Sequence, residues 1–550
     1  MIKAKGFFTL AILFFIQCGS AFAEAEVVPG EVVIKFKKEA LTLSNFEYLQ
    51  TKFHFKLKRF IPNSPYAVVK MDNKTEGEES LLAEELMSSD FVEIAEPNFI
   101  YNINKNPNDP EFGKLWGLSN TGTNDPRNEG NPGVDVSAIK AWEIQTGNPE
   151  LVVGVIDTGV DYNHEDLKDN MWVNLAEKNG KAGVDDDGNG YVDDIYGYDF
   201  YNKDSDPMDD HGHGSHCSGT IGAKGNNKIG ITGIAWNVKI MAIKIFSSGG
   251  RGGPLDGVLE AIRYATKMGA KITNNSWGGG EASELLKQVI QEAGEKGVLF
   301  VAAAGNEKNN NDARPSYPAS YPLPNVISVA AVDNRGDRAD FSNYGMKSVH
   351  VAAPGVGIYS VFPSSDGATT GYSSLSGTSM ATPHVTGIAA LLLSNEPQLT
   401  PLEVRQRLIS TSKPMPGLKR VSVSKGMVDA YNALTQFQPP PDANDPAYWV
   451  KNIELNISSQ HPYQDATEKF WEVEVPGANE VALYFQKVRT EEKFDKIILT
   501  NRKGDIVEEY TGSFDELWTS PIKGDYVKVT LRTDKTKNDY GFDLNKVVYR

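Results

Sequence analysis

The chain has 550 residues, of which 40% are hydrophobic and 23% are charged, so two or more folded units with ordinary globular cores are expected. Its 72 acidic residues outnumber its 55 basic residues, and the formal net charge is −17. This acidic surplus argues against nucleic acid or an anionic membrane as a partner.

Residues 1–23 have the pattern of a secretory signal peptide. Lys3 and Lys5 give a basic start, residues 6–17 form a short apolar run, and residues 21–23 form a small-x-small cleavage site. The run is too short to span a bilayer, and no later segment reaches about 18 apolar residues. We therefore expect a secreted, extracellular protein without a membrane span.

Only two cysteines are present, and Cys18 would leave with the signal peptide. Cys217 would then be alone, so no internal disulfide is expected. An exported protein without disulfides must be stabilised by other means, such as a large core or bound metal.

Residues 24–105 predict a small α+β unit that ends at a turn-rich break. Strands are expected at 32–36, 66–71 and 92–97, and a helix at 79–87.

Residues 106–435 alternate buried apolar strands with helices. This alternation is typical of a doubly wound α/β domain with a parallel sheet. The expected strands are 151–156, 239–244, 271–273, 298–304 and 326–332, and the expected helices are 255–268 and 284–296.

Residues 436–444 form a proline-rich linker, and residues 445–550 change in character. Short alternating strands are expected at 471–475, 481–485 and 526–531, separated by turns. This pattern is typical of an all-β sandwich.

Three polar residues occur where an α/β sheet builds its site. Asp157 ends an expected strand, and His213 and Ser379 each open an expected helix. A serine hydroxyl is a weak nucleophile that needs a histidine to take its proton, and a carboxylate orients that histidine. These residue types predict nucleophilic attack on a carbonyl group.

The segments around these residues, together with residues 303–307, resemble the four signature blocks of the subtilisin-like serine proteases (subtilases). The resemblance covers about residues 107–435. It implies a serine endopeptidase with Asp157, His213 and Ser379 as the triad, and with Asn306 as the oxyanion-hole residue. The alternative is a catalytically inactive subtilase fold that acts in binding or adhesion through its C-terminal β-sandwich.

Three histidines lie close together, and the family pattern His-Gly-Thr-His begins with the catalytic one. Here it reads His213-Gly214-Ser215-His216, so His213 is selected over His211 and His216. A zinc site formed by this cluster is a less favoured alternative. Cys217 is interpreted either as a thiol beneath the site or as a small buried side chain.

The resemblance also implies a substrate-binding strip, to which an extended peptide would add by backbone hydrogen bonds. Its expected residues are Ser276, Trp277, Gly278, Ala304, Gly305 and Ser316. An apolar or aromatic residue is expected before the cleaved bond, and Glu281 leaves a basic preference as the alternative.

An acidic segment is a candidate calcium site, because its start resembles half of a calcium-binding loop without the terminal Glu. The candidate ligands are Asp185, Asp187, Asn189, Asp193 and Asp194. A solvated acidic turn is the alternative.

A second candidate calcium site is implied by the family resemblance alone. Its candidate residues are Asp166, Asn227, Ile229, Ile231 and Asp109. No organic cofactor is expected.

The resemblance extends to both flanking units. Residues 24–105 resemble a subtilase propeptide, which would assist folding, inhibit the enzyme and be cut near residues 98–105. Residues 445–550 resemble a CUB-like sandwich, in which Glu491, Asp495 and Asp534 could match calcium positions. This domain would dock to substrate or a surface, or stabilise the enzyme, and the protein is expected to act on protein or peptide substrates as a monomer.

Overall fold

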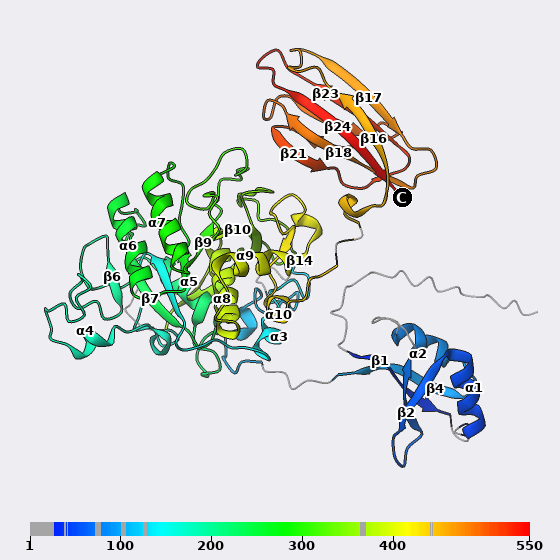
Figure 1. Cartoon of the computed structure of the whole chain (residues 1–550), viewed down its shortest axis with the longest axis horizontal. Helices are drawn as coiled ribbons and strands as arrows, with labels where there is room; N and C mark the ends of the chain where they lie inside the picture. Colours follow the sequence, from blue (N-terminus) through cyan, green and yellow to red (C-terminus); the bar gives the residue numbers. More distant parts are fainter. Residues whose placement is uncertain are drawn as a thin grey trace, which may run out of the picture. The chain divides into compact units, whose positions relative to one another are not determined.

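The computed structural model of the chain describes residues 27–37, 40, 42–71, 79–100, 106–124, 129–363, 370–440, 442 and 444–550 (Figure 1). The predicted signal peptide and residues 101–105 lie outside this part. The chain divides into two compact units, Met1–Asn106 and Pro107–Arg550, which we describe separately.

The N-terminal unit contains an antiparallel sheet with strand order β2-β3-β1-β4 and two helices. The expected helix and strands in it are confirmed, whereas helix α1 and strand β2 were not predicted. Val32, Ile34 and Phe36 alternate into a core shared with both helices. The elements are β1 (Val27–Phe36), α1 (Leu43–Phe53), β2 (Phe55–Phe60), β3 (Tyr66–Met71), α2 (Glu79–Met87) and β4 (Val92–Phe99).

The second unit begins with an α/β region built on a nine-stranded sheet of order β14-β15-β11-β10-β9-β8-β5-β7-β6. Only the short β14–β15 pair is antiparallel, so the predicted parallel sheet is confirmed. The strands are β5 (Val152–Asp157), β6 (Gly197–Asp199), β7 (Lys239–Lys244), β8 (Ile272–Asn275), β9 (Leu299–Ala303), β10 (Val326–Val332), β11 (Val351–Pro354), β14 (Lys413–Pro414) and β15 (Gly426–Met427).

Helices cover both faces of this sheet because its strands are apolar on both sides. In β7, Ile240 and Ala242 face the core of α5 (His213–Gly222) and α8 (Thr378–Asn395). The alternate residues Met241 and Ile243 face α6 (Leu255–Lys267) and α7 (Glu284–Glu295), which run side by side in Figure 1. The remaining elements are η1 (Phe112–Lys114), α3 (Ala138–Trp142), η2 (Lys168–Asn170), α4 (Leu175–Asn179), β12 (Ile358–Val361), β13 (Tyr372–Leu375), α9 (Pro401–Ser410), η3 (Pro416–Leu418) and α10 (Ala430–Thr435).

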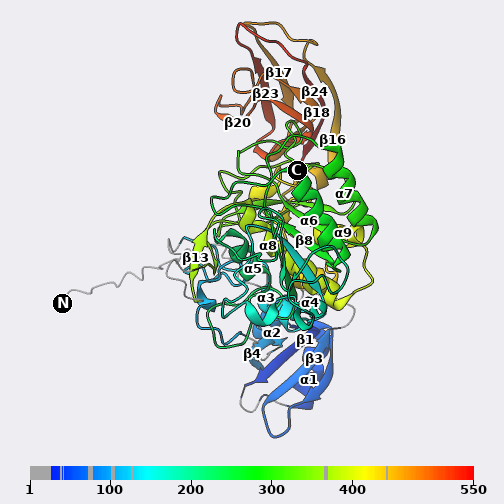
Figure 2. The ribbon, with the colours of Figure 1, turned by 90° about the vertical axis from the view of Figure 1, so that its left-hand side faces the viewer.

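The C-terminal region consists of two antiparallel sheets, drawn in orange to red in Figure 2. Their orders are β16-β24-β18-β21, with β22 paired to β18, and β17-β23-β19-β20. Phe485 and Phe542 belong to the apolar core that both sheets share, as the β-sandwich prediction requires. The elements are η4 (Pro446–Tyr448), β16 (Lys451–Ser458), β17 (Glu468–Glu474), β18 (Glu480–Arg489), β19 (Lys496–Thr500), β20 (Ile506–Tyr510), β21 (Ser513–Trp518), β22 (Ile522–Lys523), β23 (Tyr526–Arg532) and β24 (Gly541–Tyr549).

Within the described residues, no helix is both long and apolar enough to cross a membrane.

Candidate active site

Asp157 and His213 form a hydrogen-bonded pair between the end of β5 and the start of α5. The Nδ1 atom of His213 lies 2.7 Å from Oδ1 of Asp157, which is buried. Because a carboxylate accepts hydrogen bonds, this contact assigns the ring proton of neutral His213 to Nδ1. The Nε2 atom then carries the lone pair that a general base needs.

The surroundings of His213 favour its charged form. Burial lowers the pKa of the imidazole, but the charge and hydrogen bond of Asp157 raise it, and the charge of Asp209 adds to this effect. The net pKa of His213 is raised above its usual value. The pair can therefore accept a proton and stabilise the resulting imidazolium.

Ser379 is the second residue of α8 and is held against Ser276. Its hydroxyl donates to the carbonyl of Ser276 at 3.0 Å, and the Ser276 hydroxyl donates back to the carbonyl of Ser379 at 2.9 Å. In this structure the Ser379 proton thus points to Ser276 and not to His213. Proton transfer to His213 requires rotation of the Ser379 hydroxyl, and catalytic contacts commonly tighten only when substrate binds.

The amide of Asn306 has a defined orientation. Its Oδ1 accepts hydrogen bonds from the backbone N–H and the hydroxyl of Thr378, at 2.9 and 3.0 Å. A Cβ added to Gly377 would lie 3.6 Å from the Ser379 nitrogen and 3.8 Å from the Asn306 Nδ2. Both donors thus border the space that glycine leaves open, as an oxyanion hole requires.

Sequence reasoning missed Asn343, which supports the turn containing Asn306. Its Oδ1 accepts the backbone N–H groups of Glu307 and Asn309 at 2.9 Å, and its Nδ2 donates to the carbonyl of Ala304 at 3.0 Å. Asn343 is fully buried. No local motif marks it, because its partners lie more than 30 residues earlier in the sequence.

The predicted substrate-binding residues come from neighbouring segments. Ser276, Trp277 and Gly278 follow β8 directly, and Ala304 and Gly305 follow β9. The backbone of Gly279 donates to the carbonyl of Tyr317 at 3.1 Å, which brings the first segment beside the one that contains Ser316.

Burial favours the uncharged forms of His216 and Cys217, the two neighbours of His213 on α5. His216 is fully buried, and burial lowers its pKa to about 3. Cys217 is also buried, which raises the pKa of its thiol, and its Sγ lies within 4.8 Å of the nearest ligand atoms of Asp157 and His213. His211 is more remote, with its ring centroid 6.3 Å from that of His213.

The candidate calcium residues at 109, 166 and 226–231 are brought together. Asp109 accepts the backbone N–H groups of Asn226 and Asn227, at 2.7 and 3.1 Å. Asp166 accepts from the Asn227 amide and the Ile231 N–H, both at 2.8 Å. Ile229 lies in the same loop, where its N–H donates to Oδ1 of Asn227. Burial raises the pKa of Asp166 to about 6 and so disfavours its ionised form. A hard cation bound by these carboxylate oxygens would favour the ionised form.

The acidic segment at residues 185–194 also forms a carboxylate cluster, but the clustered residues differ from the predicted ligands. Oxygen atoms of Glu177, Asp185 and Asp187 lie within 4.8 Å of one another. Glu177 belongs to α4 and was not predicted, because it precedes the acidic segment. Asn189 donates its backbone N–H to Asp185 and Asp187, at 3.0 and 2.8 Å.

Two predicted ligands of this segment have other partners. Asp194 is fully buried and accepts hydrogen bonds from the Asn174 amide, the Asn189 amide and the Tyr264 hydroxyl. Asp193 accepts the Gly183 N–H at 2.8 Å. In this structure both carboxylates serve as anchors of the loop.

A third acidic cluster lies in the C-terminal sandwich. Oxygen atoms of Glu491, Asp495 and Asp534 approach within 4.8 Å of one another. The Oε2 atom of Glu491 is buried and has no hydrogen-bond partner among the described residues. A buried carboxylate oxygen without a partner is costly, and a bound cation would compensate it.

Comparison with known proteins gives a consistent family assignment. A family model described as the subtilase family (peptidase S8) matches residues 148–435. The chain is 34% identical over 409 residues to a thermophilic serine proteinase of Bacillus sp. (strain AK1), and the match covers 74% of this chain and 88% of that protein.

Other relatives match a smaller share of the chain. Thermitase of Thermoactinomyces vulgaris is 38% identical over 299 residues, which cover 54% of this chain and 93% of that protein. A solved protease structure from Pseudoalteromonas arctica is 29% identical, with a TM-score of 0.47, and the match covers 60% of this chain and 99% of that one.

Proposed function

The chain belongs to the subtilase family and is a serine protease, and we propose that it is a secreted endopeptidase made as a self-processing zymogen. The catalytic part of this proposal is carried by one observation: the 2.7 Å Asp157–His213 contact directs the lone pair of Nε2 away from the carboxylate. Secretion is supported by the signal-peptide pattern in residues 1–23.

The proposed reaction proceeds through an acyl-enzyme on Ser379. His213 takes the hydroxyl proton at Nε2 as Ser379 attacks the peptide carbonyl carbon. The oxygen that becomes negative accepts hydrogen bonds from the Asn306 Nδ2 and the Ser379 N–H. His213 then donates its proton to the leaving amine, and water hydrolyses the acyl-enzyme by the same proton route in reverse.

The test is casein hydrolysis by the mature enzyme, with covalent labelling by a serine-directed phosphonyl reagent. The wild type should hydrolyse casein, and the label should be found on Ser379. Ser379→Ala, matured by an added protease that is then removed, should lose both hydrolysis and label, whereas Ser394→Ala near the other end of α8 should retain them. A wild type that takes up no label and cleaves nothing would instead support a binding protein with an inactive subtilase fold.

The N-terminal unit is proposed to act as the inhibitor and folding assistant of the protease. Its support is a separate compact unit with its own core, which ends at Asn106, beside the predicted cleavage region. Ser379→Ala, produced without added protease, should retain this unit. If that variant were shortened normally, self-processing would be excluded.

Structural cations are proposed at three places. Asp109, Asp166 and the 226–231 loop would hold one, and Glu177, Asp185 and Asp187 would hold another. Glu491, Asp495 and Asp534 would hold the third in the CUB-like domain. Carboxylate and carbonyl oxygens suit Ca²⁺, which would neutralise buried charge and stabilise the loops.

A further inference from the structure

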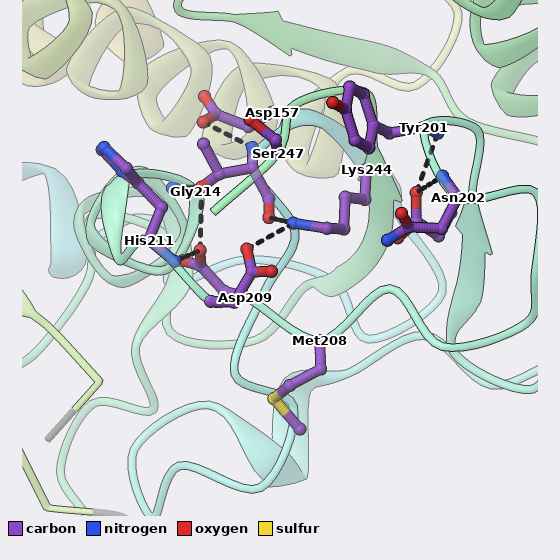
Figure 3. Close-up of polar contacts among 12 residues, drawn as sticks. Asp157, Tyr201, Asn202, Met208, Asp209, His211, Gly214, Lys244 and Ser247 are labelled. Carbon is purple, nitrogen blue, oxygen red and sulfur yellow. Dashed lines mark hydrogen bonds and ion pairs between the residues drawn. The ribbon is translucent and has the colours of Figure 1, made fainter. Parts of the chain in front are cut away.

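A buried polar network joins the end of β5 to the start of α5, where Figure 3 shows Asp157, Asp209 and Gly214. It lies beside the Asp157–His213 pair. Thr158 lies at its centre. Its N–H donates to Oδ1 of Asp157 at 2.8 Å, the same oxygen that His213 contacts. Its hydroxyl accepts the N–H of Gly214 at 2.9 Å, so its single proton is free to donate to Oδ1 of Asp209, at 2.8 Å.

Asp209 accepts hydrogen bonds from residues on both sides of this junction, after β5 and at the start of α5. Asp209 is buried, and each of its hydrogen-bond partners in the described part of the chain is a donor. The donors are the Thr158 hydroxyl, the N–H groups of His211, Gly212 and Ser215, and the Ser215 hydroxyl, at 2.7 to 3.0 Å.

The direction of these hydrogen bonds requires an acceptor at Asp209. The Ser215 hydroxyl accepts the N–H of Asp161 at 2.8 Å, so its proton is directed to Asp209, as is that of Thr158. An ionised carboxylate accepts at both oxygens and donates at neither. An asparagine at position 209 would have an NH₂ group in place of one carboxylate oxygen, and that group would face N–H or O–H donors instead of acceptors.

Lys244 holds the same junction from the neighbouring strand, β7. Its buried ammonium donates to the carbonyl of Thr158 at 2.6 Å and to Asp210 at 2.7 Å. Thr158 is thus held by hydrogen bonds of its backbone N–H, its backbone carbonyl and its side-chain hydroxyl. Figure 3 shows Lys244, Asp209 and Gly214 in this arrangement.

We propose that Asp209 is a positioning residue for His213: with Thr158 it fixes the first turn of α5 against β5, and its charge favours the imidazolium that forms during the reaction. Asp209 does not touch the reacting atoms, so it acts through His213 and the turn that carries it. The inference rests on the protease activity, which hydrolysis by the wild type establishes independently.

Other titratable groups also face His213. Asp157 contacts its Nδ1, and the rings of His211 and His216 and the Cys217 thiol are its other titratable neighbours. The charges of Asp157 and Asp209 are the ones that raise the pKa of His213. Removal of one charge should therefore be visible in the pH profile of the enzyme.

The experiment compares kcat, KM and the pH dependence of kcat/KM for Asp209→Asn, Thr158→Val, Thr158→Ser and wild type. Asp209→Asn should lower kcat by about tenfold to a hundredfold with little change in KM. Its acid limb should move to lower pH, because the imidazolium loses a favourable charge. Thr158→Val should lower kcat without moving the acid limb, because Asp209 keeps its charge. Thr158→Ser keeps the hydroxyl and should therefore keep a kcat near the wild-type value.

Asp206→Asn is the matched control, because Asp206 lies on the same loop but is exposed and contacts Tyr162 and Met208. It should behave as the wild type. An Asp209→Asn enzyme with wild-type kcat, or with reduced kcat and an unmoved acid limb, would overturn the proposal. If Asp209→Asn does not fold, equal kcat values for Thr158→Val and Thr158→Ser would overturn it.

Discussion

At the scale of the residue, the donor at Asn306 depends on a contact made by the other end of the same amide. Thr378 donates twice to Oδ1, so an inverted amide would place NH₂ against two donors. The Nδ2 is thereby fixed before substrate arrives. Fixed donors need no reorganisation as charge develops, which is why they stabilise the transition state more than the ground state.

Asn306→Ala should therefore lower kcat by about 10²–10³ with a small effect on KM. The same preparation should still take up the serine-directed label slowly, because Ser379 and His213 are untouched. Steady-state kinetics on a peptide substrate measure the effect. A large rise in KM with an unchanged kcat would mean that Asn306 binds the ground state instead.

Which site residues the sequence predicts depends on how locally they act. Asp157, His213, Asn306 and Ser379 lie in short motifs, so their roles could be expected from residue type and order. Thr158 follows Asp157 directly, yet its role depends on Asp209, 51 residues later. Asn343 and Asp209 were missed for the same reason: their roles exist only after distant segments meet. Glu177 was missed because it lies in α4, just before the acidic segment.

At the scale of the element, the sequence predicts those strands that are buried along their whole length, because such strands consist almost entirely of apolar residues. Strand β10 is buried at all seven residues, and a run that is apolar except for Ser328 predicts it well. Helix α1 was missed because it carries a weak pattern of mixed aromatic and polar residues. Strand β6 has three residues, too few for any periodicity.

The contact between α5 and the turn after β5 leaves no room for a side chain. A Cβ at Gly214 would overlap the carbonyl oxygen of Gly159 and lie 3.1 Å from the Asp157 Cβ. Gly214→Ala should displace the helix that carries His213, destabilise the fold by about 1–3 kcal/mol and remove most activity.

Gly113→Ala is the control for this change. Gly113 lies in η1, is exposed, and has no atom within 4 Å of an added Cβ. Its stability and kcat/KM should stay near the wild-type values. Thermal unfolding and peptide hydrolysis of both variants test the contact, and a fully active Gly214→Ala enzyme would show that α5 can shift without loss.

At the scale of the whole molecule, the net charge and the lack of a disulfide among the described residues point to the same requirement. Among the described residues, Cys217 is the one free cysteine and is buried. The chain carries a net charge of −17, and several of its carboxylates are clustered. Clustered carboxylates repel each other, so ions that bind only the native state would add stability by mass action.

Removal of divalent cations with EDTA should lower the thermal midpoint of the protein, and added Ca²⁺ should restore it. A single site filled at 100 times its Kd contributes about 2.7 kcal/mol. Asp187→Asn should remove part of the Ca²⁺ response of the peptidase domain, and Asp495→Asn part of the response of the sandwich. Asp505→Asn, at an exposed turn outside the three clusters, should keep the full response. Calorimetry with and without Ca²⁺ separates these effects, and an unchanged midpoint of the wild type in EDTA would exclude structural cations at all three clusters.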